Sequence, residues 1–125
     1  MNKKVKTVCL IESNLFSKSI EVWAHNSSLS LETLDSKTQD IDEFIDGVVV
    51  FHENHNISKE IEDLQLILDS ANRPGHRIDI NGTLAATKSN FEMWLERNKP
   101  SKLLFLGKND LPKNKNLQRF LENLM

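Results

Sequence analysis

The sequence predicts a three-layer α/β domain built around a parallel β-sheet, and three observations lead to that fold class. Short apolar runs alternate with amphipathic stretches five times along the 125 residues. Residues 48–51 read Val-Val-Val-Phe without a polar interruption, which is typical of a strand buried on both faces. No linker or repeat divides the chain, so we expect residues 1–125 to form a single domain.

Five segments have the composition of β-strands. Residues 7–11, 48–51 and 103–106 are almost wholly apolar, as the buried strands of a parallel sheet are. Residues 29–34 at first alternate leucine with polar residues, which indicates an edge strand. Residues 76–81 also alternate, with isoleucines separated by charged and polar residues, and this is unusual for a strand expected inside the sheet.

Apolar residues at helical spacing predict a helix after each strand. Ser13 or Asn14 can cap the first helix, Ser58 can cap the third, and Gly82-Thr83 turns the chain into the fourth. The apolar faces of the five expected helices are Phe16, Ile20 and Trp23; Ile41, Phe44 and Ile45; Ile57, Ile61, Leu64 and Leu68; Leu84, Phe91 and Leu95; and Leu117, Phe120, Leu121 and Leu124. Such alternation requires right-handed crossovers, with helices on both faces of the sheet. We therefore expect a flavodoxin-like (βα)5 fold with strand order 2-1-3-4-5, in which residues 48–51, the most apolar strand, are central.

The charge and cysteine content exclude several classes of function. The chain has 16 basic and 18 acidic residues and a formal net charge of −2, which argues against a nucleic-acid partner or a polybasic membrane anchor. No apolar run is long enough to span a bilayer or to act as a secretory signal. The single cysteine, Cys9, excludes an internal disulfide and fits a reducing compartment. We therefore expect a cytoplasmic protein without a membrane partner.

Four motifs follow one another as they do in a known signalling family. Residues 8–14 combine an apolar strand with Glu12 at its end, and residues 47–52 form the buried third strand. Asn81 to Thr83 follow the fourth strand, and residues 106–109 end the fifth strand with a lysine. In this order and position the motifs resemble the receiver domain of bacterial response regulators, in the single-domain chemotaxis form.

The resemblance implies a role in signal transduction and a surface for protein partners. In the family, the end of the fifth strand carries an aromatic residue that switches and a lysine that meets the phosphorylated aspartate. Phe105 and Lys108 take these positions here. The resemblance places the interaction surface on the fifth strand and the last helix, with Phe105, Lys108 and Leu117 as its residues. We expect a protein partner or a homodimer to bind there.

The departures from the family indicate that its chemistry is absent. Phosphorylation of a receiver requires a carboxylate nucleophile and two further carboxylates that help to hold Mg²⁺. Glu12 keeps one of these, but Ser13 replaces the second and His52 replaces the acceptor. An imidazole cannot form an acyl phosphate and is a poor ligand for Mg²⁺. Glu53 is the next residue of the strand, so its side chain points to the opposite face from that of His52 and cannot replace it as the acceptor. We therefore expect a pseudo-receiver that is not an enzyme and holds no metal or cofactor.

An alternative function is a small-molecule-binding or enzymatic site at the carboxyl edge of the sheet. The residues that this edge would bring together are Glu12, Ser13, His52, Glu53, Asp79, Asn81, Thr83 and Lys108. Asp79 is open to two interpretations, because it can form a buried ion pair with Arg77 or Lys108, or belong to a functional pocket. A zinc site is less favoured, because His76 begins its strand and lies at the opposite edge from His52 and His55.

Overall fold

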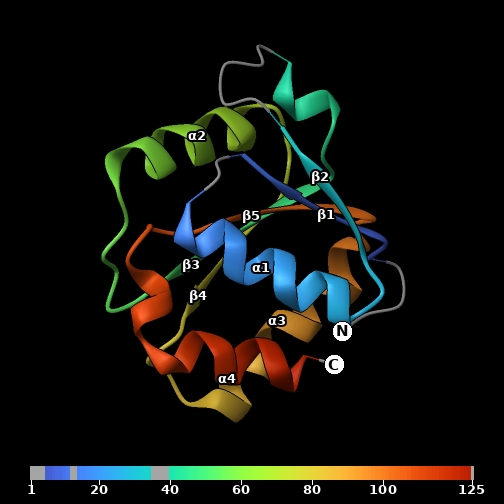
Figure 1. The fold of residues 1–125 in the computed structure, drawn as a ribbon. Helices are drawn as coiled ribbons and strands as arrows, with labels where there is room; N and C mark the ends of the chain where they lie inside the picture. The colour runs from blue at the N-terminus through green and yellow to red at the C-terminus, as the bar shows by residue number, and fades with distance from the viewer. Residues whose placement is uncertain (1–4, 12–13, 35–39, 125) are drawn as a thin grey trace.

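The structure, a computed structural model, describes residues 5–11, 14–34 and 40–124. Within these ranges the chain forms a five-stranded parallel sheet with helices on both faces, as Figure 1 shows. The strands are β1 (Thr7–Leu10), β2 (Ser30–Thr33), β3 (Gly47–His52), β4 (Gly75–Asp79) and β5 (Lys102–Leu106). The predicted α/β class with a parallel sheet is confirmed, and the architecture is consistent with a flavodoxin-like fold.

The strand order is 2-1-5-3-4, so the expected order 2-1-3-4-5 is wrong. The last strand, β5, lies in the centre of the sheet between β1 and β3, and β4 lies at an edge. Residues 103–106 of β5 are as buried as residues 48–51 of β3, so apolar content alone does not rank the two strands. The alternating pattern of β4 is the signal of an edge strand, on which Arg77 is exposed.

The helices in the described ranges are α1 (Leu15–Asn26), α2 (Lys59–Ser70), α3 (Leu84–Asn98) and α4 (Lys115–Asn123). Two short 3-10 turns, η1 (Ile41–Glu43) and η2 (Leu111–Lys113), complete the elements there. The helix expected around Ile41 is therefore only the single turn η1. As predicted, the side chains of Asn14 and Ser58 cap α1 and α2, since they accept hydrogen bonds from the N–H groups of Ser17 and Ile61.

The directions of the crossovers decide which face each helix covers. In the order 2-1-5-3-4, the connections β1–β2 and β4–β5 run across the sheet in one direction, and β2–β3 and β3–β4 run in the other. Right-handed crossovers then place α1 and α3 on one face, and η1 and α2 on the other. Helix α4 contacts α1 and α3, so three helices share the first face, as Figure 1 shows.

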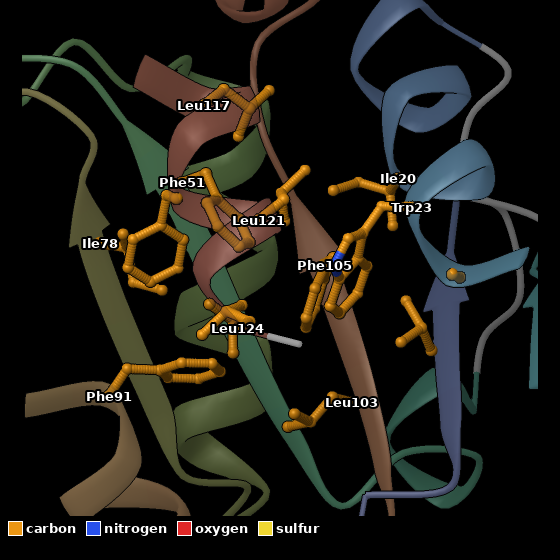
Figure 2. Close-up of a cluster of buried hydrophobic side chains, with 14 of the residues drawn as sticks. Ile20, Trp23, Phe51, Ile78, Phe91, Leu103, Phe105, Leu117, Leu121 and Leu124 are labelled. Atoms are coloured by element: carbon orange, nitrogen blue, oxygen red, sulfur yellow. The ribbon is translucent and has the colours of Figure 1, made fainter. Parts of the chain in front are cut away.

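The core consists of two clusters, one on each face of the sheet. The cluster under α1, α3 and α4 contains five buried phenylalanines, and we call this side the aromatic face. Phe51 lies at its centre, with ring centroids 5.7 Å from Phe16, 5.2 Å from Phe105 and 6.0 Å from Phe120. Figure 2 shows Phe51 and Phe105 within this cluster. Such ring pairs each contribute about 0.5–1.5 kcal/mol beyond the burial of their area.

The cluster under α2 and η1 has no aromatic member among the described residues, and we call this side the aliphatic face. Its buried residues are Cys9, Ile41, Ile45, Val48, Val50, Leu68, Leu104 and Leu106. Burial, together with the negative charge of Glu32, raises the pKa of the Cys9 thiol to about 11. Cys9 is therefore an uncharged core residue at neutral pH, with little reactivity.

Candidate functional site

His52 ends β3 and is one of the few buried polar side chains, with 2% of its surface exposed. It faces the aliphatic side of the sheet, because Phe51 before it faces the aromatic side. Its Nδ1 accepts a hydrogen bond of 3.0 Å from the N–H of His55, and the two rings stack with centroids 5.1 Å apart. The imidazole thus holds the loop that follows β3.

The surroundings of His52 favour its neutral form. Burial lowers its pKa, and the charges of His55 and Arg77 act in the same direction against the opposing carboxylate of Asp79. An imidazole whose Nδ1 accepts a hydrogen bond carries its proton on Nε2. Protonation of Nδ1 would place two donors against each other and break the bond to His55. The buried ring is therefore a structural acceptor at neutral pH.

Asp79 lies beside His52 in the register of β3 and β4. Its Oδ1 accepts hydrogen bonds from the N–H groups of Asn54, at 3.2 Å, and of Asn81, at 3.0 Å. Within the described ranges no ion pair joins Asp79 to a cation, and Arg77 instead donates from Nε and Nη2 to Oε1 of Gln65 on α2. Asp79 therefore ties the loops after β3 and β4 together, a role that neither interpretation of the sequence foresaw.

Glu53 and Asn81 meet through the first residues of α4. The side-chain amide of Asn114 donates to Oε2 of Glu53, at 2.9 Å, and to Oδ1 of Asn81, at 2.8 Å. Asn116 Nδ2 donates to the same Asn81 oxygen at 2.9 Å, and Asn114 Oδ1 caps the N–H of Asn116. Sequence reasoning missed both asparagines, although a capping residue before the apolar face of the last helix is a readable signal.

Lys108 and Thr83 stand apart from this polar network. Lys108 Nζ donates to Oδ1 of Asn56 at 3.1 Å, and it is not paired with an anion among the described residues. Thr83 is exposed at the start of α3 and makes no side-chain cap hydrogen bond. Glu12 and Ser13 lie outside the described residues. The structure thus brings together His52 with Asp79, and Glu53 with Asn81, but neither pair with Lys108.

Two of the three residues expected on the interaction surface are core residues. Phe105 is 1% exposed and Leu117 is 2% exposed, and both belong to the aromatic face (Figure 2). Phe105 stacks on Trp23 with centroids 5.9 Å apart. These two residues are therefore buried in the core and not exposed to a partner as predicted, because α1 and α4 cover the strand that carries Phe105. Only Lys108 of the three is partly exposed.

A groove of about 690 Å³ opens at the carboxyl edge, between α2 and the ends of β1 and β5. We call it the α2 groove. Its aliphatic walls are Ile61, Leu64 and Ile67 of α2, facing Ile11 and Leu106. The start of α1, at Asn14, Phe16 and Ser17, forms another wall, and of the three residues predicted for the interaction surface Phe105 and Lys108 line the groove. Its volume falls within the range of ligand-binding clefts.

The chemistry available at this edge is limited. The histidine and the carboxylates that the structure describes at the strand ends accept hydrogen bonds from neighbouring loops. In the part of the chain that the structure describes, no group of three His, Cys, Asp or Glu side chains is placed to hold a metal ion. The same residues include no helix with the length and apolar character needed to cross a bilayer. The hydrogen bonds at this edge link the loops that follow β3 and β4 to each other and to the start of α4.

Comparison with known proteins identifies no relative of the chain. No family model matches the chain, and neither a curated protein nor a solved structure matches it. The function must therefore be inferred from the edge and the groove themselves.

Proposed function

We propose that the protein is a regulatory protein-interaction module that does not undergo aspartyl phosphorylation. One observation carries the proposal: His52 occupies the end of β3, where a receiver has its acceptor aspartate, and its ring is buried and bonded to His55. The buried imidazole offers no carboxylate oxygen to a phosphoryl donor. It also offers no hard oxygen ligand to Mg²⁺.

The nearby carboxylates support the same proposal. Asp79 Oδ1 accepts two backbone hydrogen bonds, and Glu53 Oε2 accepts one from Asn114. These hydrogen bonds hold each carboxylate to a neighbouring loop, which supports a structural role for both groups. The receiver-like order of motifs supports a signalling role. The strand order 2-1-5-3-4 is not the order expected for a receiver. The proposal therefore depends on the hydrogen bonds of His52, Asp79 and Glu53 and not on the fold. The single buried Cys9 supports a cytoplasmic location.

The test is to incubate the protein with acetyl phosphate and Mg²⁺ and to weigh it intact. We expect the mass to remain that of the unmodified chain. The variant His52→Asp, which places a carboxylate at the end of β3, is treated in the same way for comparison. A stoichiometric phosphoryl adduct on a carboxylate of the unaltered protein would contradict the proposal.

A second candidate function is small-molecule binding, and the α2 groove is the observation that favours it. A thermal-shift screen against nucleotides, flavins and metabolites distinguishes the two functions, because a ligand that binds only the folded state raises the melting temperature. We expect no saturable shift. A shift that Ile67→Asp abolishes would favour the second function over the first.

A further inference from the structure

Among the described residues, the α2 groove lies at the carboxyl edge of the sheet, between α2 on the aliphatic face and the start of α1. The described part of the connection between β2 and β3 contains the single turn η1, and α2 packs over β3 and β4. The ends of β1 and β5 on this face, at Ile11 and Leu106, therefore border open space beside α2. Figure 1 shows α2 on this side of the sheet, opposite α1, α3 and α4.

The wall that α2 contributes is apolar along its length. Ile61, Leu64 and Ile67 recur every three residues, so they lie on one side of the helix. Ile67 is 57% exposed, and the adjacent Leu66 is 64% exposed and extends the apolar surface beyond the groove. Two neighbouring exposed aliphatic residues on one helix, beside a groove, mark a surface suited to a partner.

The same helix gives the groove an acidic rim. Glu60 and Asp63 line the groove, and α2 also carries Glu62 and Asp69 against a single cation, Lys59. Four acidic residues and one basic residue give α2 a net charge of −3. Lys108, on the opposite wall, donates to Asn56. The groove therefore combines apolar walls with a border on which two described acidic residues, Glu60 and Asp63, outnumber one cation, Lys108.

Charge complementarity selects the occupant. A second copy of the chain that used the same surface would bring two acidic α2 helices together, and anionic lipid would also be repelled. A strand is not favoured, because the groove is walled by side chains of α2 and not by the free edge of β2 or β4. A helix with apolar residues at three- and four-residue spacing and a basic flank fits both features of the groove.

We propose that the α2 groove docks a positively charged amphipathic helix of a partner protein. This inference deepens the proposed interaction function and depends on it. The apolar side chains of the partner helix pack against Ile61, Leu64 and Ile67, and its lysines or arginines lie near Glu60 and Asp63. Surface charges of this kind accelerate association and make it sensitive to salt.

The probe is a fluorescently labelled peptide of lysine and leucine, about four helical turns long, with leucine at three- and four-residue spacing. A matched peptide has glutamate in place of every lysine. Fluorescence anisotropy measures binding, and two-dimensional amide NMR maps it. We expect the lysine peptide to bind, to shift the amide signals of α2 and of residues 106–109, and to bind more weakly as NaCl is raised. We expect the glutamate peptide not to bind.

Matched variants locate the site. Ile67→Asp and the double variant Glu60→Lys/Asp63→Lys alter exposed positions of the groove and should leave the fold intact, which circular dichroism checks. Each should weaken the peptide affinity by about tenfold or more. The controls are Val22→Asp, at a 64% exposed position of α1, and Glu21→Lys/Glu92→Lys, on α1 and α3. These controls lie on the other side of the sheet and should change the affinity by less than about twofold.

Three results would overturn the inference. The first is peptide binding that the controls reduce as much as the groove variants do. The second is equal affinity for the glutamate peptide. The third is a dimer in sedimentation that Ile67→Asp dissociates, which would assign the groove to a second copy. None of these results produces a phosphoryl adduct, so the failure of this inference is distinguishable from the failure of the proposed function.

Discussion

On one face of the sheet three helices bury five phenylalanines, whereas on the other the described chain places one α-helix and one 3-10 turn over an aliphatic cluster. On the aromatic face the central ring, Phe51, contacts three others, and a hollow of about 380 Å³ opens between α1 and α4. The aliphatic face leaves the α2 groove and the exposed Leu66 and Ile67 beside it. The difference teaches that the aromatic residues of the core are gathered on one face, whereas the groove of about 690 Å³ lies beside the single α-helix described on the other.

The largest effect is expected at the centre of the aromatic face. Phe51→Ala removes a ring that is 1% exposed and leaves a cavity between Phe16, Phe105 and Phe120. We expect a loss of about 3–5 kcal/mol in the free energy of unfolding, measured by urea denaturation. A loss below about 1 kcal/mol would show that the cluster relaxes around the cavity and that the two faces do not differ as described.

A smaller but clear effect is expected where α1 meets the loop after β5. A Cβ atom at Gly107 would lie 2.6 Å from the ring of Phe16, so Gly107→Ala overpacks the edge of the aromatic face. We expect it to destabilise the fold by about 1–3 kcal/mol in the same denaturation experiment. The variant Gly107→Ala/Phe16→Leu should recover part of the loss, since the smaller side chain makes room. An additive double variant would argue against the contact.

The polar network at the start of α4 supports the aromatic face from its edge. Asn114→Ala removes the cap of α4 and the hydrogen bonds to Glu53 and Asn81. The expected loss is about 1–2 kcal/mol, again from urea denaturation. Asn116→Ala, which removes only one of the bonds to Asn81, is the control and should cost less. Equal losses would mean that the cap does not contribute.

Acid should weaken the fold through one histidine on each face. Burial lowers the pKa of His76, which stacks on Phe91 and Trp94, and burial likewise lowers that of His52. The unfolded chain then binds protons more readily than the folded one, so the contribution of these groups is present above pH 6.5 and is lost as the pH falls below it. The double variant His52→Asn/His76→Phe, which keeps an acceptor and a ring, should flatten this dependence of melting temperature on pH.

The control for the acid prediction is His25→Gln, because His25 is exposed on α1. It should leave the pH dependence of the melting temperature unchanged. If the double variant shows the same decline below pH 6.5 as the unaltered protein, carboxylates and not these two histidines are responsible.

The smallest effect on stability is expected at the exposed residues of α2, on the aliphatic face. Leu66→Ser and Ile67→Ser change side chains that are 64% and 57% exposed, so each should alter the free energy of unfolding by no more than about 0.5 kcal/mol. The contrast between these small changes in the free energy of unfolding and the large loss expected for Phe51→Ala tests the comparison of the two faces most directly. A loss above about 2 kcal/mol at either position would show that these residues are part of the core.

The elements of the fold could be read from the sequence, but their arrangement could not. Apolar runs and capping residues such as Asn14 and Ser58 identified strands and helix starts, because these signals are local. The strand order depends on which of two equally apolar strands, β3 or β5, is central, and local pattern does not distinguish them. The alternation of polar and apolar residues around Arg77 was the signal that β4 lies at an edge of the sheet, since edge strands tolerate such polar residues.

The candidate site could be predicted only as a neighbourhood. Because parallel strands end together, the sequence placed His52 near Asp79, and the two residues are partners in the register of β3 and β4. It could not show that Asp79 would bond to the backbone of Asn54, or that Asn114 would reach Glu53, since those contacts depend on how loops cross. Phe105 was misplaced for the same reason, because its exposure is decided by α1 and α4.

The central position of β5 has a consequence for how the chain folds during synthesis. Strand β1 pairs with β2 and β5, and β3 pairs with β4 and β5, so among the described strands no ladder joins the two halves except through residues 102–106. A growing chain can therefore form two separate strand pairs, but it can close one sheet only after β5 has left the ribosome. Until then both halves expose apolar edges to other chains. The last strand of the sheet to be made is the one that joins the two pairs into one sheet.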